Sequence, residues 1–132
     1  MKITQALLDS LTEQAKASPR LRMNYDLRNS SEDKSQRMLN AIEPGSVIPI
    51  HRHQKSTETV VCLRGKLVWE YYDELERICT ERIDVSHNGP VVALNIPIRQ
   101  WHTLRSLESG TVILETKDGA YEPLNPADIL VV

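Results

Sequence analysis

The feature of this 132-residue chain that most constrains its fold is a series of short apolar segments separated by turn-forming residues. The segments follow one another at a spacing of about ten residues, which is typical of the strands of a small β-sandwich or barrel. Turn dipeptides such as Asn88-Gly89 and Ser109-Gly110 lie between them, and their glycines reach positive φ without steric cost. The predicted strands cover residues 36–43, 46–51, 58–64, 66–73, 77–84, 91–96, 101–106 and 111–117.

The composition agrees with an all-β fold that has an aliphatic core. The chain contains no phenylalanine, but it has 15 leucines, 10 isoleucines and 10 valines. β-Branched side chains pack well on pleated surfaces, so the excess of isoleucine and valine over leucine favours strands. A chain of this length buries roughly two thirds of its surface on folding and needs no disulfide. We therefore expect Cys62 and Cys79 to be free thiols.

One helix is predicted ahead of the strands, over residues 3–17. Its apolar residues share one face of a 3.6-residue period and are Ile3, Leu7, Leu8, Leu11 and Ala15. Thr4 is a candidate N-cap, and Ser18-Pro19 ends the helix because proline disfavours a helical residue before it. A lone amphipathic helix must bury its apolar stripe elsewhere. We therefore expect a single domain, with a helix and connecting arm over residues 1–35 and a barrel with a C-terminal tail over residues 36–132.

Charge and hydropathy exclude several classes of function. The chain has 16 Lys and Arg residues against 18 Asp and Glu residues, so it lacks the basic excess of nucleic-acid binders. No segment approaches the roughly 18 consecutive apolar residues of a membrane span. The first residues carry Asp9 and Glu13 within their apolar part and lack the features of a secretory signal. We therefore predict a cytoplasmic protein with no nucleic-acid partner and no membrane partner.

The residues with the clearest chemical potential are His51 and His53. On a strand, residues i and i+2 point to the same face with Cα atoms about 7 Å apart, so two imidazoles could share a metal ion. Glu58 opens the next predicted strand, and His102 could supply a further ligand from a distant one. This nitrogen and oxygen donor set suits Zn, Fe, Ni or Mn. Two histidines at this spacing are, by themselves, more often exposed or hydrogen-bonded, so spacing alone leaves both interpretations open.

Glycines frame the histidine segment at fixed distances. Five residues separate Gly45 from His51, four separate His53 from Glu58, and six separate Glu58 from Gly65. This arrangement resembles the first motif of the cupin superfamily. We expect a hairpin between His53 and Glu58 that brings the carboxylate beside the two imidazoles, and glycines just before and after it suit the turns that it requires.

The second cupin motif is looser in this chain. It begins at Gly89 and continues over residues 97–102. Pro97 and His102 are in register with it, but Arg99 stands where the family usually has glycine. The resemblance implies a cupin double-stranded β-helix, a small jelly-roll barrel, with one divalent transition metal ion inside. The metal ligands that it implies are His51, His53, Glu58 and His102.

A longer resemblance connects most of the chain with the WbuC-type cupin-fold metalloproteins of bacterial O-antigen and other surface-polysaccharide gene clusters. It rests on residues 19–24, 36–41, 43–45 and 114–121. It implies a role in the synthesis of a surface polysaccharide such as the lipopolysaccharide O-antigen. No firmly assigned reaction comes with it.

Further residues are candidates for catalysis and for substrate binding. Glu115 is a candidate general acid or base if strand alternation turns its carboxylate into the barrel. The alternative is an outward Glu115 paired with Lys117 or an arginine. Arginines in the first 37 residues could hold a carboxylate or phosphate through paired hydrogen bonds. The predicted substrate contacts are Arg20, Arg22, Asn24, Arg37, Lys55 and Tyr121.

Together these residues predict a metal-dependent enzyme of the isomerase, epimerase or lyase type that acts on a sugar or sugar nucleotide. The metal would act as a Lewis acid on a carbonyl or hydroxyl group. Two alternatives stay open: a non-catalytic module that anchors a sugar on the metal, and an Fe(II)-dependent dioxygenase. A titratable group near the metal would favour an enzyme. We also expect the chain to form a homodimer.

Overall fold

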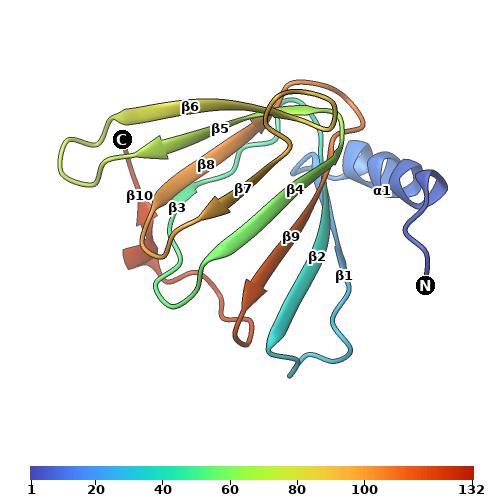
Figure 1. Ribbon diagram of the computed structural model, residues 1–132, viewed down its shortest axis with the longest axis horizontal. Helices are drawn as coiled ribbons and strands as arrows, with labels where there is room; N and C mark the ends of the chain where they lie inside the picture. The colour runs from blue at the N-terminus through green and yellow to red at the C-terminus, as the bar shows by residue number, and fades with distance from the viewer.

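The computed structural model describes residues 1–132 and confirms an all-β fold with one N-terminal helix. Ten strands form two five-stranded antiparallel sheets, in the orders β1-β2-β9-β4-β7 and β10-β3-β8-β5-β6. The elements are α1 (Gln5–Ala17), β1 (Arg22–Asp26), β2 (Ser35–Ile42), β3 (Ile50–His51), β4 (Glu58–Arg64), β5 (Lys66–Tyr72), β6 (Cys79–Ser86), β7 (Ala93–Ile96), β8 (Trp101–Ser106), β9 (Val112–Asp118), the 3₁₀ turn η1 (Pro126–Asp128) and β10 (Ile129–Leu130). Figure 1 shows the strands converging at the top of the view and fanning apart below.

The core lies between the two sheets and follows the two-residue alternation of the strands. Inward positions of one sheet meet inward positions of the other in a cluster of nine buried residues. These are Ile42, Val60, Cys62, Leu67, Trp69, Val85, Ile96, Leu104 and Ile113. Trp69 is the only aromatic ring among them, so the core is aliphatic, as the composition predicted. Both cysteines are free thiols, which confirms that expectation.

Helix α1 packs on the outer face of the first sheet, beside β1 and β2 (Figure 1). Its buried side chains Leu8, Leu11 and Ala15 contact the outward residues of that sheet. These outward residues are Leu39, Ala41 and Val112. The hydroxyl of Thr4 accepts a hydrogen bond from the amide of Leu7, so the predicted cap is confirmed. With only 13 residues, α1 is not a helix that could cross a membrane.

The structure differs from the sequence prediction at several element boundaries. The helix begins at Gln5, and Ile3 lies before it with 44% of its surface exposed. Strand β3 has only two residues instead of the predicted 46–51, because Pro49 has no N–H for a ladder hydrogen bond. Strands β1 and β10 were not predicted: β1 is an edge strand with a mixed polar sequence, and β10 has two residues.

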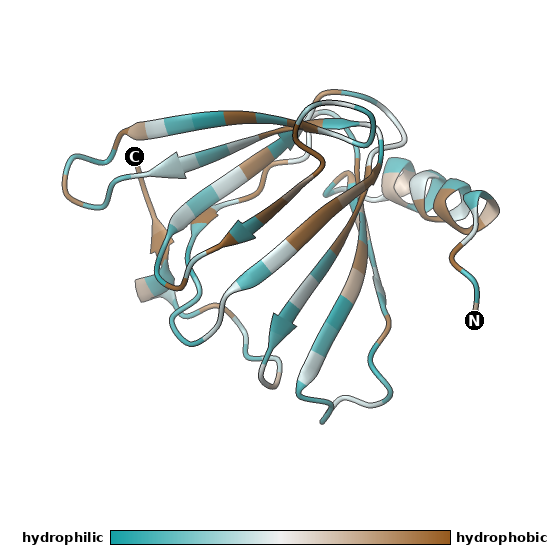
Figure 2. Ribbon diagram, viewed as in Figure 1, coloured by the Kyte–Doolittle hydropathy of each residue, from teal (hydrophilic) through white to brown (hydrophobic).

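Polar residues gather where β4 begins and β9 ends, which is one end of the barrel. Figure 2 shows hydrophilic colour at the lower ends of β2, β4 and β9 and hydrophobic colour higher up the same strands. The register explains this, because Glu58 at the start of β4 pairs with Lys117 near the end of β9. In the same way, Gln36 near the start of β2 pairs with Lys117 from the other side. This polar end is called the mouth of the barrel below.

Candidate metal centre

Three of the four histidines meet at the mouth of the barrel. His51 and His102 are direct cross-strand partners in β3 and β8, and their ring centroids lie 4.4 Å apart. His53 follows two residues after His51, and its ring centroid is 5.1 Å from that of His51 and 5.6 Å from that of His102. One nitrogen from each imidazole belongs to a set of atoms that all lie within 4.8 Å of one another. Three such nitrogens could hold one metal ion.

Hydrogen bonds fix the tautomers of two of these histidines. Nδ1 of His51 lies 2.8 Å from the carbonyl oxygen of Pro49, and Nδ1 of His102 lies 2.8 Å from that of Gln100. A carbonyl oxygen only accepts, so Nδ1 carries the proton in both rings and Nε2 offers a lone pair. His102 is 1% exposed, and its Nε2 has no hydrogen-bond partner. A buried acceptor without a donor is rare, and a metal ion would satisfy it.

Burial also keeps these imidazoles neutral. Desolvation, followed by the proximity of His102, lowers the pKa of His51 to about 4. Desolvation likewise lowers the pKa of His102, although Glu58 acts in the opposite direction. Neutral imidazole is the form that binds metal ions, so both rings are ready to act as ligands at neutral pH.

Glu58 adjoins the histidines as the fourth expected ligand. Its Oε2 atom lies 3.0 Å from Nε2 of His53, and the side chain is buried. Burial by itself would raise the pKa of Glu58. The hydrogen bond from His53, together with the electrostatic effects of His102, His53 and Lys117, outweighs burial and holds that pKa below its usual value. An ionised carboxylate beside three imidazole nitrogens is a donor set that suits a divalent transition metal.

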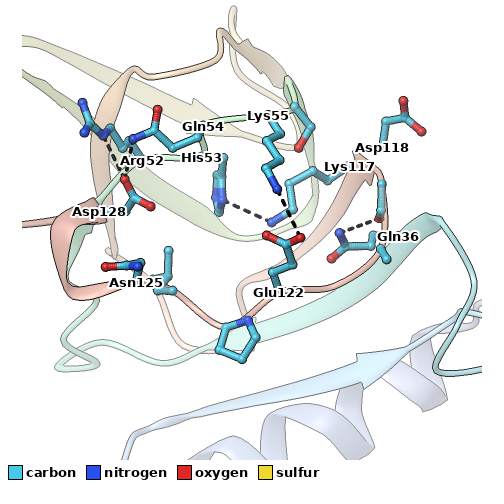
Figure 3. Close-up of a pocket in the computed structure, with 15 residues that line it drawn as sticks. Gln36, Arg52, His53, Gln54, Lys55, Lys117, Asp118, Glu122, Asn125 and Asp128 are labelled. Carbon is cyan, nitrogen blue, oxygen red and sulfur yellow. Dashed lines mark hydrogen bonds and ion pairs between the residues drawn. The ribbon is translucent and has the colours of Figure 1, made fainter.

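Lys117 completes the immediate surroundings of His53. Its Nζ atom lies 3.3 Å from Nδ1 of His53, as the dashed line in Figure 3 shows. In this arrangement the ammonium donates to Nδ1, and Nε2 of the same ring donates to Glu58. The His53 ring is thereby held between a cation and an anion.

A cavity of about 320 Å³ opens from Glu58 along the inner face of the first sheet. It is lined by Asn24, Asp26, Arg28, Gln36, Arg37, Met38, Glu58, Glu115, Lys117 and Tyr121. Glu115 is half-buried on β9 and faces this cavity. Desolvation, with a further contribution from the negative charge of Glu58, raises the pKa of Glu115 to about 8. At neutral pH this carboxyl group is therefore mostly protonated and able to give or take a proton.

A second cavity of about 330 Å³ lies beyond His53, between the His53–Ser56 loop and the C-terminal segment (Figure 3). Asp128 anchors that segment, because it accepts hydrogen bonds from Arg52 at 3.1 Å and from Gln54 at 2.8 Å. The guanidinium of Arg52 also lies over the ring of Trp101, 4.4 Å from its centroid. Lys117 and Gln36 line both cavities and stand between them.

The other residues predicted from the sequence fall into two groups. Asn24, Arg37 and Tyr121 line the cavity beside Glu58, and Lys55 lines the second cavity. Arg20 and Arg22 line neither: Arg20 is exposed, and Nη1 of Arg22 donates to the carbonyl of Val47 at 2.8 Å. Sequence reasoning did not propose Gln36, Arg28 or Asp26 as lining residues, nor Lys117. Strand alternation from Glu115 would have placed Lys117 on the same face.

Arg99 occupies the position where the cupin motif usually has glycine, and it adopts the glycine conformation. Its φ of 66° lies in the left-handed region. Its amide donates to the carbonyl oxygen of His53 at 2.8 Å, which ties the turn before β8 to the histidine segment. The turn geometry is therefore kept without the glycine, at the expense of backbone strain.

Comparison with solved structures agrees with the cupin fold. KdgF from a Halomonas species matches with a TM-score of 0.60 and 15% identity over 77% of this chain and 82% of KdgF. The cupin domain of Schizosaccharomyces pombe Cnp3 gives 0.59 and 10%, over 74% of this chain and 64% of that one. The capsular polysaccharide assembling protein CapF from Staphylococcus aureus gives 0.63 and 20%, over 86% of this chain and 32% of CapF. At these identities the likeness establishes the jelly-roll fold alone.

Comparison of sequences gives a family but no activity. None of the curated proteins compared with this chain matches its sequence, and the expected relation to the WbuC-type proteins stays a prediction. The model of a family described as a domain of unknown function, DUF6016, matches residues 3–83. The matched segment runs from α1 through β5 and includes His51, His53 and Glu58, but it ends before His102. Because the match spans more than half of the chain, the protein belongs to the DUF6016 family.

Proposed function

We propose that the protein binds one divalent transition metal ion, Zn, Fe, Ni or Mn, through His51, His53, Glu58 and His102. The observation that carries this proposal is the buried Nε2 atom of His102, which has no partner and belongs to a group of three imidazole nitrogens within 4.8 Å of one another. Two of these imidazoles already have their second nitrogen satisfied by backbone carbonyls, an arrangement that orients metal-binding histidines.

We propose further that the centre is catalytic and acts on a sugar or sugar nucleotide by isomerisation, epimerisation or elimination. A bound metal would supply Lewis-acid polarisation of a carbonyl or hydroxyl oxygen. Each of these reactions also needs a group that moves a proton, and Glu115 is that group. It faces the cavity that reaches Glu58, and its pKa of about 8 suits proton transfer near neutral pH. Glu115 favours the enzyme over the non-catalytic sugar-binding module.

The cavity beside Glu58 suits a small polar substrate. Its lining offers hydrogen-bond donors and acceptors for hydroxyl groups, with Asn24, Arg37 and Tyr121 as the predicted contacts. The predicted contact Lys55 lines the second cavity instead. Arg20 and Arg22 stand away from both cavities, so we assign them no contact. The fold is shared with a capsular polysaccharide assembling protein, which is compatible with a carbohydrate substrate in surface-polysaccharide synthesis. A homodimer and a cytoplasmic location remain further predictions.

The test is elemental analysis of the purified protein together with His51→Ala and His102→Ala variants. We expect about one metal ion per chain in the wild type and strong loss of metal in both variants. Wild-type protein that stays metal-free after reconstitution would refute the proposal. A screen of reconstituted protein against nucleotide sugars and uronic acids then tests catalysis. Consumption of O₂ that requires loaded iron would instead support the dioxygenase.

A further inference from the structure

Lys117 has an unusual position among the charged residues of the mouth. It lies on β9 between Gln36 on β2 and Glu58 on β4, and its side chain lines both cavities. Its only polar partner is Nδ1 of His53, at 3.3 Å, and no carboxylate oxygen lies within 4.0 Å of its Nζ atom. An ammonium group that is half-buried and in direct contact with no carboxylate is a ready site for an anion.

Every other cation of the two cavities is already paired with a carboxylate. Arg28 binds Asp26 at 2.7 Å, and Arg37 binds Asp33 at 3.3 Å. Arg52 binds Asp128 at 3.1 Å, and Lys55 lies 3.4 Å from Glu122. Lys117 is therefore the cation that an incoming anion can reach without breaking an ion pair.

A metal ion at the centre would leave Lys117 without its present partner. A neutral imidazole has one N–H, so coordination through Nε2 puts the proton of His53 on Nδ1. The ammonium of Lys117 would then face another donor at 3.3 Å. Glu58, which lies opposite Lys117 on the neighbouring strand, would then be a metal ligand.

We propose that Lys117 anchors an anionic group, a carboxylate or a phosphate, of the carbohydrate that binds beside the metal centre. This inference rests on the proposed function and narrows the substrate to an acidic or phosphorylated sugar. Lys117 would contact the substrate and select it by charge, with the rest of the molecule lying in the cavity that reaches Glu58 and Glu115. Gln36 stands next to Lys117 in both cavities, although its amide already donates to the carbonyl of Gly119 at 2.8 Å.

The test uses titration calorimetry on the wild type, Lys117→Met and, as a control of equal charge, Lys66→Met. Lys66 is exposed at the start of β5 and lines neither cavity. Zinc is titrated first, and we expect Lys117→Met to bind it at least as tightly as the wild type, because His53 has lost a competing donor. If the wild type binds none of zinc, iron, nickel and manganese, the proposed function itself is refuted, and this inference with it.

The zinc-loaded proteins are then titrated with three matched sugars: glucuronate, glucose 6-phosphate and glucose. We expect Lys117→Met to lose about tenfold or more in affinity for the anionic sugar that the wild type prefers, with no change for glucose. Whether the wild type binds glucuronate or glucose 6-phosphate more tightly shows whether Lys117 binds a carboxylate or a phosphate. Lys117→Arg should retain the affinity, and Lys66→Met should match the wild type.

Three outcomes would overturn the inference while leaving metal binding intact. One is a wild type that binds zinc but neither anionic sugar. Another is an equal loss for glucose and the anionic sugars in Lys117→Met. The third is a Lys117→Met variant that is folded by circular dichroism yet binds zinc far more weakly, which would make Lys117 a support for the centre.

Discussion

Replacing Gly65 by alanine is a direct test of what holds the tight turn between β4 and β5 in place. Gly65 joins β4 to β5 with a φ of 87°, a conformation that L side chains rarely adopt. A β-carbon there would lie 2.6 Å from the Cα atom of Thr111 and 2.8 Å from its Cβ atom. The glycine that closes the first cupin motif is thus required by backbone conformation and by close packing together.

The expected loss of stability is the sum of the cost of positive φ and the cost of overpacking. Positive φ costs a residue with a side chain about 1–2 kcal/mol. Overpacking against a backbone that cannot move aside adds about 1–3 kcal/mol. We therefore expect Gly65→Ala to lose about 2–5 kcal/mol of unfolding free energy, a large part of the about 5–15 kcal/mol of a typical domain. For a domain of this size the melting temperature should fall by roughly 10 °C.

Gly119→Ala provides the matched control. Gly119 has a φ of 97°, but nothing lies within 4 Å of a β-carbon built there. Gly119→Ala therefore has the same cost of positive φ and the same change in unfolded-chain entropy as Gly65→Ala, but it lacks the cost of overpacking. Urea denaturation of both variants should show Gly65→Ala less stable than Gly119→Ala by about 1–3 kcal/mol. Equal losses would refute the packing argument for Gly65.

Three further predictions concern the mouth of the barrel. Glu115→Gln should gain stability relative to the wild type as pH rises from about 4.5 to about 8. The folded-state pKa of Glu115 lies above its usual value of 4.5, so the wild type loses stability over this range, whereas the glutamine variant does not. Urea denaturation in EDTA at about pH 5 and about pH 8 measures the difference between the two proteins, and a difference that does not change with pH would contradict the prediction. Arg99→Gly should be neutral or stabilising by up to about 1 kcal/mol, since strain relief is offset by unfolded-state entropy, and a clear loss in urea melts would show that the side chain matters. Zinc should raise the melting temperature of the wild type but not of His102→Ala, and an equal rise in both would argue against His102 as a ligand.

The sequence was sufficient to predict most of the strands, because the patterns that indicate a strand are local. Apolar runs and turn dipeptides predicted all the long strands of both sheets, and the first cupin motif correctly brought His51, His53 and Glu58 together. The hairpin expected between them was wrong, because β3 and β4 lie in different sheets and do not pair with each other. β1 could not be found in this way. It is an edge strand whose residues are mostly polar, and it is recruited by pairing with β2, a contact of long sequence separation.

The surroundings of the site were less predictable because they depend on register. Arg20, Arg22 and Arg37 look alike in the sequence, but only Arg37 reaches a cavity. Arg22 instead satisfies the carbonyl of Val47 in the loop that leads to β3. The contact of Lys117 with His53 depends on the alignment of β9 with β4, which no local pattern reveals.

The inner and outer faces of β9 explain why the core and the site are built as one unit. Inward positions run from buried Ile113 through half-buried Glu115 to Lys117 at the mouth, so a single strand passes from dry core to wet cavity in four residues. A one-residue slip would reverse every side chain of this strand. The outward residue Val112 packs in the cluster that also contains Leu8 and Leu11 of α1, and burying this apolar face makes the slipped register unfavourable. By covering the outside of the sheet, helix α1 thus fixes Glu115 and Lys117 inside the barrel, beside the candidate metal centre.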